Sequence, residues 1–452
     1  MKKVIEKQTH IQMAALYICR FALFLCIIIF LVSSSAKFAV AGQGDWFVAQ
    51  TGDNTNDCQS SITPCATIEA VIAKGSFVPG DTIFVDNGYY IKSPGANLII
   101  KKDVILSGGW NSTFTNQVGY TDIGGGQSGL EIEQGVTATI SQFSVLGMEH
   151  DAAILNYGSL RLDKARAESY GGQGVYNLGN ARLQNSRFDG SLGMGILNSG
   201  VMSMTNISVS GHNTTGIGNS GVMTITHSII RKQFGWWGCR GIGNGYSGKL
   251  TVIDSAIIQN TSIYPGIGGG ICNYGNATLI NSTVSGNNTR GEGGGIYNAG
   301  QLFLFNSTIS HNSGSIGGGI YITSTGQVTA ENTILAANWA LAKNDCSGEI
   351  HSLGYNLIET TNQCKIISSE GDLLNVNAQI FPTTNNYAYS PLGRGSSAIN
   401  NGDPMGCMDQ WQIIIATDQR GVLRSGRCDI GAYEYDPAHD ILNYIFFPQI
   451  FR

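Results

Sequence analysis

Two equally spaced pairs of arginines are the first candidates for chemistry in this chain, together with the acids among them. The arginines are Arg161, Arg166, Arg182 and Arg187, and the acids are Asp163, Glu168 and Asp189. Such a group could bind an acidic glycan, or place an arginine beside carboxylate metal ligands. The simpler interpretation is a solvated lattice of salt bridges, each worth at most about 1 kcal/mol. We favour the lattice, because the charges nearly balance.

An aromatic segment between residues 231 and 240 is the second candidate. Phe234, Trp236 and Trp237 lie between basic residues in a stretch that lengthens its repeat. Adjacent tryptophans can stack on sugar rings, and loops on repeat proteins often carry binding function. The structural alternative is that these rings cover a bend in the molecule, with Cys239 held by a disulfide. The sequence favours this alternative but does not exclude binding.

An internal repeat must position both candidates. A motif of the form G-I-x-N recurs along the chain, starting at Ala153, Gly174, Gly195, Gly216, Gly241, Gly270, Gly295 and Gly319. Successive starts lie roughly 20–30 residues apart, which suits one coil of a β-solenoid and is too short for a propeller blade or a helical repeat. We therefore predict an all-β chain folded as a right-handed parallel β-helix of about 8–12 coils, with an N-terminal cap and a small disulfide-containing C-terminal segment.

The register within each repeat supports this fold. Ile or Val lies two residues before the motif asparagine, and apolar residues lie four, six and eleven residues after it. Positions four and six alternate as on one strand face, and stacked coils repeat about every 4.8 Å. Stacked amides can hydrogen-bond along such a rod. We predict a ladder of Asn156, Asn177, Asn198, Asn219, Asn273 and Asn298. The motif glycine is expected at a turn that needs backbone angles other residues resist.

Seven N-x-S/T sequons could be read as glycosylation sites. They are Asn206, Asn213, Asn260, Asn276, Asn281, Asn287 and Asn306. Because most of them follow the repeat, we interpret these asparagines as ladder and turn residues instead.

The N-terminal segment, residues 1–41, predicts export. Three lysines precede an apolar run from Phe21 to Val32, and Ala39-Val40-Ala41 follows. This order is typical of a secretory signal peptide, and an uncleaved anchor is the alternative. Without residues 1–41 the chain has 26 − 5 = 21 basic and 31 − 1 = 30 acidic residues, a net charge of −9. That balance argues against nucleic acid as a partner.

Eight cysteines remain after the signal segment, and an even number in an exported chain predicts disulfides. Close spacing favours the pairs Cys58–Cys65, Cys346–Cys364 and Cys407–Cys428. Cys239 and Cys272 are left as a less certain pair. No C-x-x-C spacing suggests zinc, and no motif specifies a cofactor. Calcium stays open, although Asp53–Asp57 lacks the glycine and glutamate of a calcium loop.

Several segments resemble known β-helix proteins. G-G-G-I-Y-N at Gly293–Asn298, followed by F-N-S-T-I-S-H-N at Phe305–Asn312, resembles the repeats of polymorphic outer-membrane proteins, which belong to the pectin-lyase-like superfamily. Cys58 through Tyr90 looks like the N-terminal part of bacterial β-helix proteins, in which a cap helix, here Thr67–Lys74, covers the first coil. The wider resemblance covers residues 45–360.

The C-terminal segment resembles the choice-of-anchor Q domain. The matching residues include Asp418-Gln419-Arg420-Gly421 and Cys428-Asp429-Ile430-Gly431-Ala432-Tyr433. The resemblance implies surface attachment through this region. The apolar tail is too short to span a bilayer and is either a sorting tail or a final strand.

These observations divide the chain and leave two functions open. We predict a signal peptide (1–41), a cap with first coils (42–150), core repeats (151–345), last coils with the anchor-like segment (346–435) and a tail (436–452). The favoured function is a non-catalytic adhesin or envelope protein, monomeric and at the cell surface or outside the cell, that binds a polysaccharide or surface glycan. The alternative is a polysaccharide lyase or glycoside hydrolase of the pectin-lyase-like superfamily, which would need convergent carboxylates.

Overall fold

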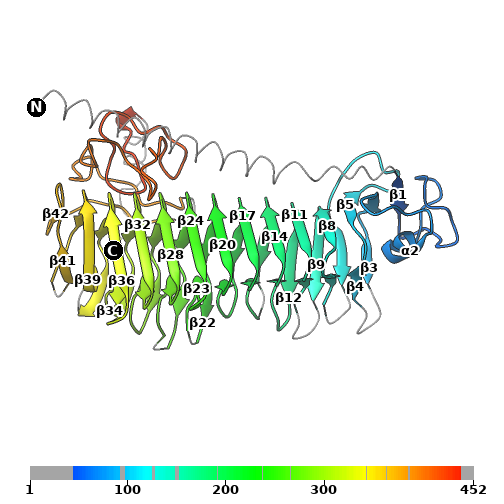
Figure 1. Ribbon diagram of the computed structural model, residues 1–452, viewed down its shortest axis with the longest axis horizontal. Coiled ribbons are helices and arrows are strands. Elements are labelled where there is room, and N and C mark those ends of the chain that lie inside the picture. The colour runs from blue at the N-terminus through cyan, green and yellow to red at the C-terminus, as the bar shows by residue number, and fades with distance from the viewer. Residues whose placement is uncertain are drawn as a thin grey trace, which may run out of the picture.

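The computed structural model describes residues 44–91, 97–124, 128–147, 152–190, 192–236, 238–264, 266–342, 344–362, 364–384 and 387–438. The predicted signal segment, Trp237 and the last part of the tail lie outside these residues. The described chain forms a rod of about 11 solenoid turns, with a loop-rich lobe on one side of its C-terminal end (Figure 1). The predicted parallel β-helix is confirmed.

The largest sheet has 24 parallel strands, which are arranged in two columns along the rod. The short-strand column contains the strands that end at the motif asparagines. The long-strand column contains the strand that follows in each coil. The strands of the whole sheet are β1 (Asp45–Val48), β2 (Thr82–Asp86), β4 (Leu98–Ile100), β5 (Val104–Trp110), β7 (Leu130–Ile132), β8 (Thr137–Ser141), β10 (Ile154–Asn156), β11 (Ser159–Asp163), β13 (Val175–Asn177), β14 (Asn180–Gln184), β16 (Ile196–Asn198), β17 (Val201–Thr205), β19 (Ile217–Asn219), β20 (Val222–Thr226), β23 (Ile242–Asn244), β24 (Lys249–Ile253), β27 (Ile271–Asn273), β28 (Asn276–Ile280), β31 (Ile296–Asn298), β32 (Gln301–Phe305), β35 (Ile320–Ile322), β36 (Gln327–Glu331), β39 (Cys346–Gly354) and β41 (Cys364–Ile367).

The second sheet has 13 strands and forms another side of the rod. Its strands are β3 (Tyr89–Ile91), β6 (Thr121–Gly124), β9 (Phe143–Gly147), β12 (Arg166–Ser169), β15 (Arg187–Asp189), β18 (Ser208–Ser210), β21 (Ile229–Arg231), β25 (Ala256–Ile258), β29 (Thr283–Ser285), β33 (Thr308–Ser310), β37 (Ile334–Ala336), β40 (Leu357–Ile358) and β42 (Leu373–Leu374).

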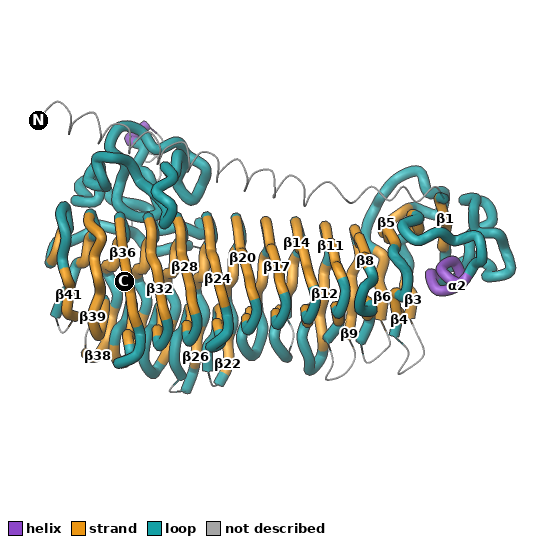
Figure 2. The backbone as a smooth tube through the Cα atoms, viewed as in Figure 1, coloured by secondary structure: helices purple, strands orange, loops and turns teal. Residues whose placement is uncertain are grey.

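A third sheet of five strands exists only in the longer coils. Its strands are β22 (Phe234–Gly235), β26 (Thr261–Ser262), β30 (Asn288–Thr289), β34 (Ser313–Ile316) and β38 (Trp339–Ala342). The repeats become longer where this sheet begins, so the added residues build a further side of the rod. Figure 2 shows the strands stacked coil upon coil.

Apolar side chains fill the axis of the rod, and buried amides line two of its corners. Asn156 Nδ2 donates to Asn177 Oδ1 at 2.6 Å, and the same bond recurs at 2.8 Å over the next five steps as far as Asn298. Asn244 is part of this ladder, although it was absent from the prediction. In its coil the turn between the motif asparagine and the next strand is longer. The apolar residues of that strand therefore lie further along the sequence from the asparagine than in the other coils.

The expected role of the motif glycine was wrong. Gly174 and Gly195 do not adopt a left-handed backbone, but a Cβ on Gly174 would lie 2.6 Å from the carbonyl oxygen of Gly195 in the next coil. Close stacking of coils therefore requires the glycine. The left-handed residues lie instead eight positions after the motif asparagine, where Asn185 and Asn206 have φ of 48° and 56°. Asparagine tolerates this conformation better than most residues.

A short helix covers the N-terminal end of the rod, and a loop-rich lobe lies against one side of the rod near its other end. Helix α2 (Ile68–Ala73) begins at Thr67, whose hydroxyl accepts from the Ala70 amide, and it buries Ile68, Val71 and Ile72 against the first coils. At the other end the C-terminal lobe (residues 376–438) folds back along the rod (Figure 1). A second small core joins the two parts, made of Ile334, Ala336, Leu357, Ala378, Leu392, Ala398, Ile430 and Tyr433. No helix among the described residues is long and apolar enough to cross a membrane.

Candidate functional site

The predicted arginine cluster is divided between two sides of the rod. Arg161 and Arg182 are paired in the long-strand column, whereas Arg166 and Arg187 are paired in the 13-stranded sheet. Between them the chain turns at Lys164, which has a φ of 48°. The four guanidinium groups therefore do not form one face.

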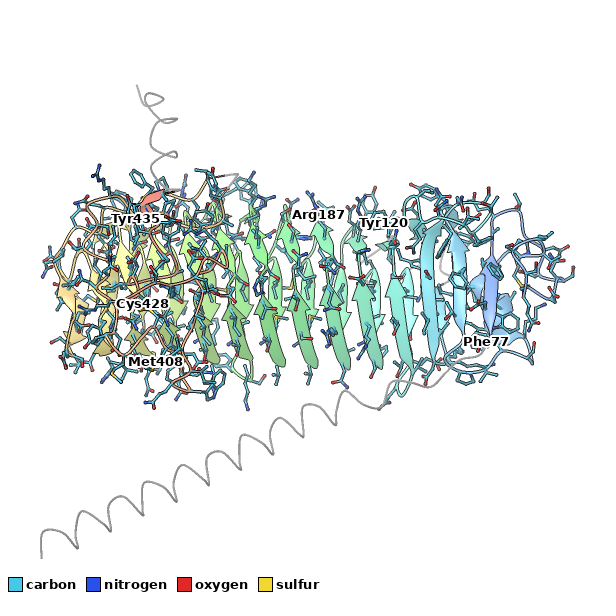
Figure 3. The ribbon with its side chains drawn as sticks, turned by 90° about the horizontal axis from the view of Figure 1, so that it is seen from above. Phe77, Tyr120, Arg187, Met408, Cys428 and Tyr435 are labelled. Atoms are coloured by element: carbon cyan, nitrogen blue, oxygen red, sulfur yellow. A yellow bond between two sulfur atoms is a disulfide. The ribbon has the colours of Figure 1, made fainter. Side chains whose placement is uncertain are left out.

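The charged side chains at the start of the 13-stranded sheet have different surroundings. Arg187 forms a salt bridge with Asp189, and the Arg166 guanidinium lies 4.2 Å from the centre of the Tyr120 ring. Burial and the neighbouring Asp189 carboxylate raise the pKa of Glu168, against the opposing effect of Arg166. Figure 3 shows Arg187 and Tyr120 on the same side of the rod. Of the salt bridges predicted among these residues, the structure shows the one between Arg187 and Asp189.

The C-terminal lobe covers the later part of the same sheet. Thr283 Oγ1 donates to Gln419 at 2.5 Å, the Ser310 and Ser390 hydroxyls lie 2.9 Å apart, and the Ala432 amide donates to Thr308 Oγ1. The outward hydroxyls of β29 and β33 are thus used within the molecule.

Buried charges hold the lobe together and join it to the rod. Arg424 forms a salt bridge with Glu434 at 3.2 Å and donates to Asn281 Oδ1 of the rod at 2.8 Å. Burial lowers the pKa of Arg424. Burial and the nearby Glu434 raise the pKa of Asp429 to about 7. The lobe therefore buries several ionisable side chains, whereas the motif ladder of the rod consists of neutral amides.

Four disulfides are formed: Cys58–Cys65, Cys239–Cys272, Cys346–Cys364 and Cys407–Cys428. The pairing that the sequence left uncertain, Cys239–Cys272, links two successive coils just after β22. It fixes the segment that carries the exposed aromatic residues.

The aromatic segment projects from the first strand of the five-stranded sheet. Phe234 is 55% exposed and Trp236 is 59% exposed. The Trp236 ring stacks on Tyr264 of the next coil, with 5.3 Å between ring centres and 29° between planes. The preceding coil contributes no strand to this sheet, although the Phe234 amide donates to the His212 carbonyl of that coil.

Behind this segment, the buried side chain of Arg240 lies against β22. Its guanidinium is so close to Gly235 that a Cβ at that position would collide with it. Nη1 of Arg240 donates to the Asn213 carbonyl at 3.5 Å. The disulfide and this buried side chain together give the exposed rings a rigid base.

The last strand of the five-stranded sheet also carries exposed apolar side chains. Trp339 is 58% exposed and Leu341 is 79% exposed. Trp339 lies in the same register column as Phe234, with Thr261, Asn288 and Ser313 on the three strands between them. The sheet thus has aromatic residues at both edges and small polar residues between.

Four tyrosines form a different aromatic stack near the short-strand column. Ring centres of Tyr246, Tyr274, Tyr297 and Tyr321 lie 5.1, 5.8 and 5.6 Å apart in turn. Within the stack the rings cover one another, so only the first, Tyr246, is strongly exposed, at 85%.

A cavity of about 840 Å³ lies at the last coils beside the turn at residues 323–326. Glu349 there binds Lys365 at 2.6 Å and His351 at 3.0 Å. These side chains are more than 40% exposed, which makes the group a surface salt-bridge network.

Metal-binding groups are not assembled in the part of the chain that the structure describes. No set of three or more His, Cys, Asp or Glu side chains converges there. In the segment compared above with a calcium loop, Asp53 accepts hydrogen bonds from Thr55, and Asp57 accepts one from Thr63. These carboxylates stabilise local turns.

Four of the sequon asparagines, Asn260, Asn281, Asn287 and Asn306, are fully buried. Their amides are hydrogen-bonded within the structure. Glycans cannot be attached there without disrupting the fold.

A second amide ladder and the fourth side of the rod were not predicted from the sequence. The second ladder runs from Asn260 through Asn287, Asn312 and Asn338 to Asp345, with steps of 2.9 to 3.0 Å. A signal was present, because Asn287 and Asn312 each follow their own motif asparagine at the same separation. Earlier coils place His212 and Gln233 at that position, which hid the pattern.

Comparisons with known proteins show a shared fold. No family model matches this chain, and no curated protein matches it at a significant level. The solved structure of XylC in complex with xylose has a TM-score of 0.52 at 9% identity, over 87% of this chain and 98% of that one. This likeness supports the right-handed parallel β-helix fold.

Two further structures are similar at lower TM-scores. The pectate lyase Pel9A has a TM-score of 0.48 at 13% identity, over 88% of this chain and 98% of that one. The A-module of the mannuronan C-5 epimerase AlgE4 from Azotobacter vinelandii has 0.40 at 13% identity, over 69% of this chain and 92% of that one.

Proposed function

We propose that this protein is an exported, non-catalytic glycan-binding protein that works outside the cell or at its surface. The observation that carries the proposal is the exposed, rigidly supported Trp236 at the edge of the five-stranded sheet. Sugar rings present flat apolar faces that stack well on such side chains, and aromatic residues dominate the energetics of many binding surfaces.

The position of Trp236 suits this role. Tyr264 supports one face of the indole, and the Cys239–Cys272 disulfide restrains the segment that follows. Binding therefore requires little ordering of the protein, which lowers the entropic cost of association.

Three carboxylates of the rod have partners within the molecule. Asp189 pairs with Arg187, Asp254 accepts from Asn281 at 2.6 Å, and Glu349 pairs with Lys365. A glycosidase instead needs two carboxyl groups set across one bond. This use of the acids supports binding in preference to cleavage.

Location outside the cell is part of the proposal. The four disulfides support it, because such bonds persist in oxidising compartments. Attachment to the cell surface through the C-terminal lobe follows from the anchor-like sequence of that segment.

The test is calorimetric titration of the purified protein with xylohexaose and cellohexaose. Xylose is bound in the XylC structure, which makes a neutral xylo-oligosaccharide a reasonable first probe. We expect Trp236→Ala to weaken binding about tenfold or more, as is common for a central aromatic contact.

The matched control is Tyr246→Ala, which removes another exposed aromatic side chain of the rod. It should leave the affinity unchanged. Equal weakening by both substitutions, or release of reducing sugar from either probe by the wild-type protein, would contradict the proposal.

A further inference from the structure

We propose that the whole outer face of the five-stranded sheet is a binding trough for one extended, neutral glycan chain that runs parallel to the rod axis from Phe234 and Trp236 to Trp339. This inference rests on the proposed function and deepens it, since it assigns a second aromatic contact and a class of ligand. The evidence is the register of the sheet, the state of its polar side chains and its low charge.

The register places the two aromatic edges in one line. Phe234 pairs with Thr261, Thr261 with Asn288, Asn288 with Ser313, and Ser313 with Trp339. With about 4.8 Å between neighbouring strands, four steps span roughly 19 Å. A single sugar cannot contact both edges, whereas an extended oligosaccharide can.

The side chains between the edges are available to a ligand. Asn288 is exposed, and Thr261 and Ser313 are half-buried. Among the described residues, none forms a side-chain hydrogen bond with any of these three. On the 13-stranded sheet, by contrast, the outward hydroxyls of Thr283 and Ser310 are bonded to the lobe. Glycan hydroxyls can donate to and accept from the free groups of the trough.

The charge of the trough favours a neutral chain. The neighbouring outward column contains Ile263, Arg290, Ser315 and Leu341, so Arg290 is the one charged side chain of these two described columns. An acidic polysaccharide would need a row of cations. A protein–protein interface typically has an apolar core and a polar rim, whereas this face has small polar side chains at its centre and aromatic residues at its edges.

The experiment compares ligands of two lengths. The probes are xylobiose and xylohexaose, with cellobiose and cellohexaose as a second pair, titrated into the wild-type protein, Trp339→Ala, Trp339→Gln and Tyr246→Ala. We expect Trp339→Ala to weaken binding of the hexaoses roughly 3–10-fold while leaving that of the bioses unchanged. Trp236→Ala should weaken both lengths.

The outcomes distinguish the extended glycan site from the proposed function on which it rests. If the hexaoses bind no better than the bioses, or if Trp339→Ala and Trp339→Gln leave hexaose affinity unchanged, the trough is wrong while the site at Trp236 stands. If neither length binds the wild-type protein, the proposed function fails. Circular dichroism checks that each variant is folded, and the glutamine variant replaces the alanine variant if the latter is not. A Trp339-dependent dimer in sedimentation, without length-dependent binding, would show that the sheet edge contacts a second copy and would overturn the inference.

Discussion

The outer faces of the 13-stranded and five-stranded sheets share one backbone architecture and differ in what their side chains contact. On the first, Arg187 pairs with Asp189, and further along Ser310 contacts Ser390 of the lobe. On the second, Trp236 and Trp339 are more than half exposed. Several polar groups of the first face have partners within the molecule, whereas the second face carries exposed aromatic side chains at its edges.

On our proposal, this difference separates stability from recognition in the solenoid. Equivalent residues of successive coils form columns on every side of the rod. A column whose polar groups find partners in the chain contributes to the fold, whereas an open column with aromatic edges remains free to bind.

The largest expected effect is on the covered face. Arg424→Ala removes a cation that is buried beside Glu434 and Asp429. Leaving one partner of a buried ion pair uncompensated typically costs about 3–5 kcal/mol. We expect the lobe to become sensitive to limited proteolysis, while the rod and binding of xylohexaose are retained. A lobe that resists proteolysis in the variant as well as in the wild type would contradict the role of Arg424. If the variant lost xylohexaose binding as well as the folded lobe, the two faces would not be independent.

The second effect is a dependence of lobe stability on pH. The pKa of Asp429 is raised to about 7 in the folded protein, against about 3.9 for an unperturbed aspartate. The folded state therefore holds this proton more tightly, and stability falls as pH rises from about 4 to about 7. Burial also raises the pKa of Asp254 and of Glu331, beside the lobe, in the same direction.

We therefore expect the unfolding temperature of the lobe to be lower at pH 8 than at pH 5, as measured by calorimetry. Asp429→Asn should make the unfolding temperature of the lobe depend less on pH. The substitution also removes one of the two backbone hydrogen bonds that the carboxylate accepts. A wild-type unfolding temperature that rises over the same range would contradict the assignment.

The smallest change in stability is expected for substitutions in the charged part of the 13-stranded sheet that the lobe does not cover. Arg187→Ala removes an exposed salt bridge, which is worth about 0–1 kcal/mol. Urea unfolding should shift by no more than that, and glycan affinity should not change. A large loss of affinity for an acidic probe such as oligogalacturonate would show that this face binds ligand after all.

The rod could be predicted because its determinants are local and periodic. The motif asparagine at Asn156 recurs at Asn177 and Asn198 with the same apolar positions around it, so stacking follows from spacing alone. The five-stranded sheet could not be predicted in this way. Its aligned column contains Phe234, Thr261, Asn288, Ser313 and Trp339, and no residue type repeats.

The candidate site was predicted in part. The segment with Phe234 and Trp236 was identified from its composition, but its extension to Trp339 depends on which residues the coils align. The arginine cluster was assigned to one face because the corner at Lys164 was not anticipated. The position of the lobe depends on contacts between distant residues, such as Arg424 with Asn281, which no periodic pattern predicts.

The central claim is that the five-stranded sheet, and not the charged sheet, binds glycan. The most direct test is titration of xylohexaose into two double variants, Trp236→Ala with Trp339→Ala and Arg166→Ala with Arg187→Ala. The account predicts that the tryptophan double variant loses at least about tenfold in affinity, while the arginine double variant binds as the wild type does. Full binding by the tryptophan variant, with loss in the arginine variant, would contradict it.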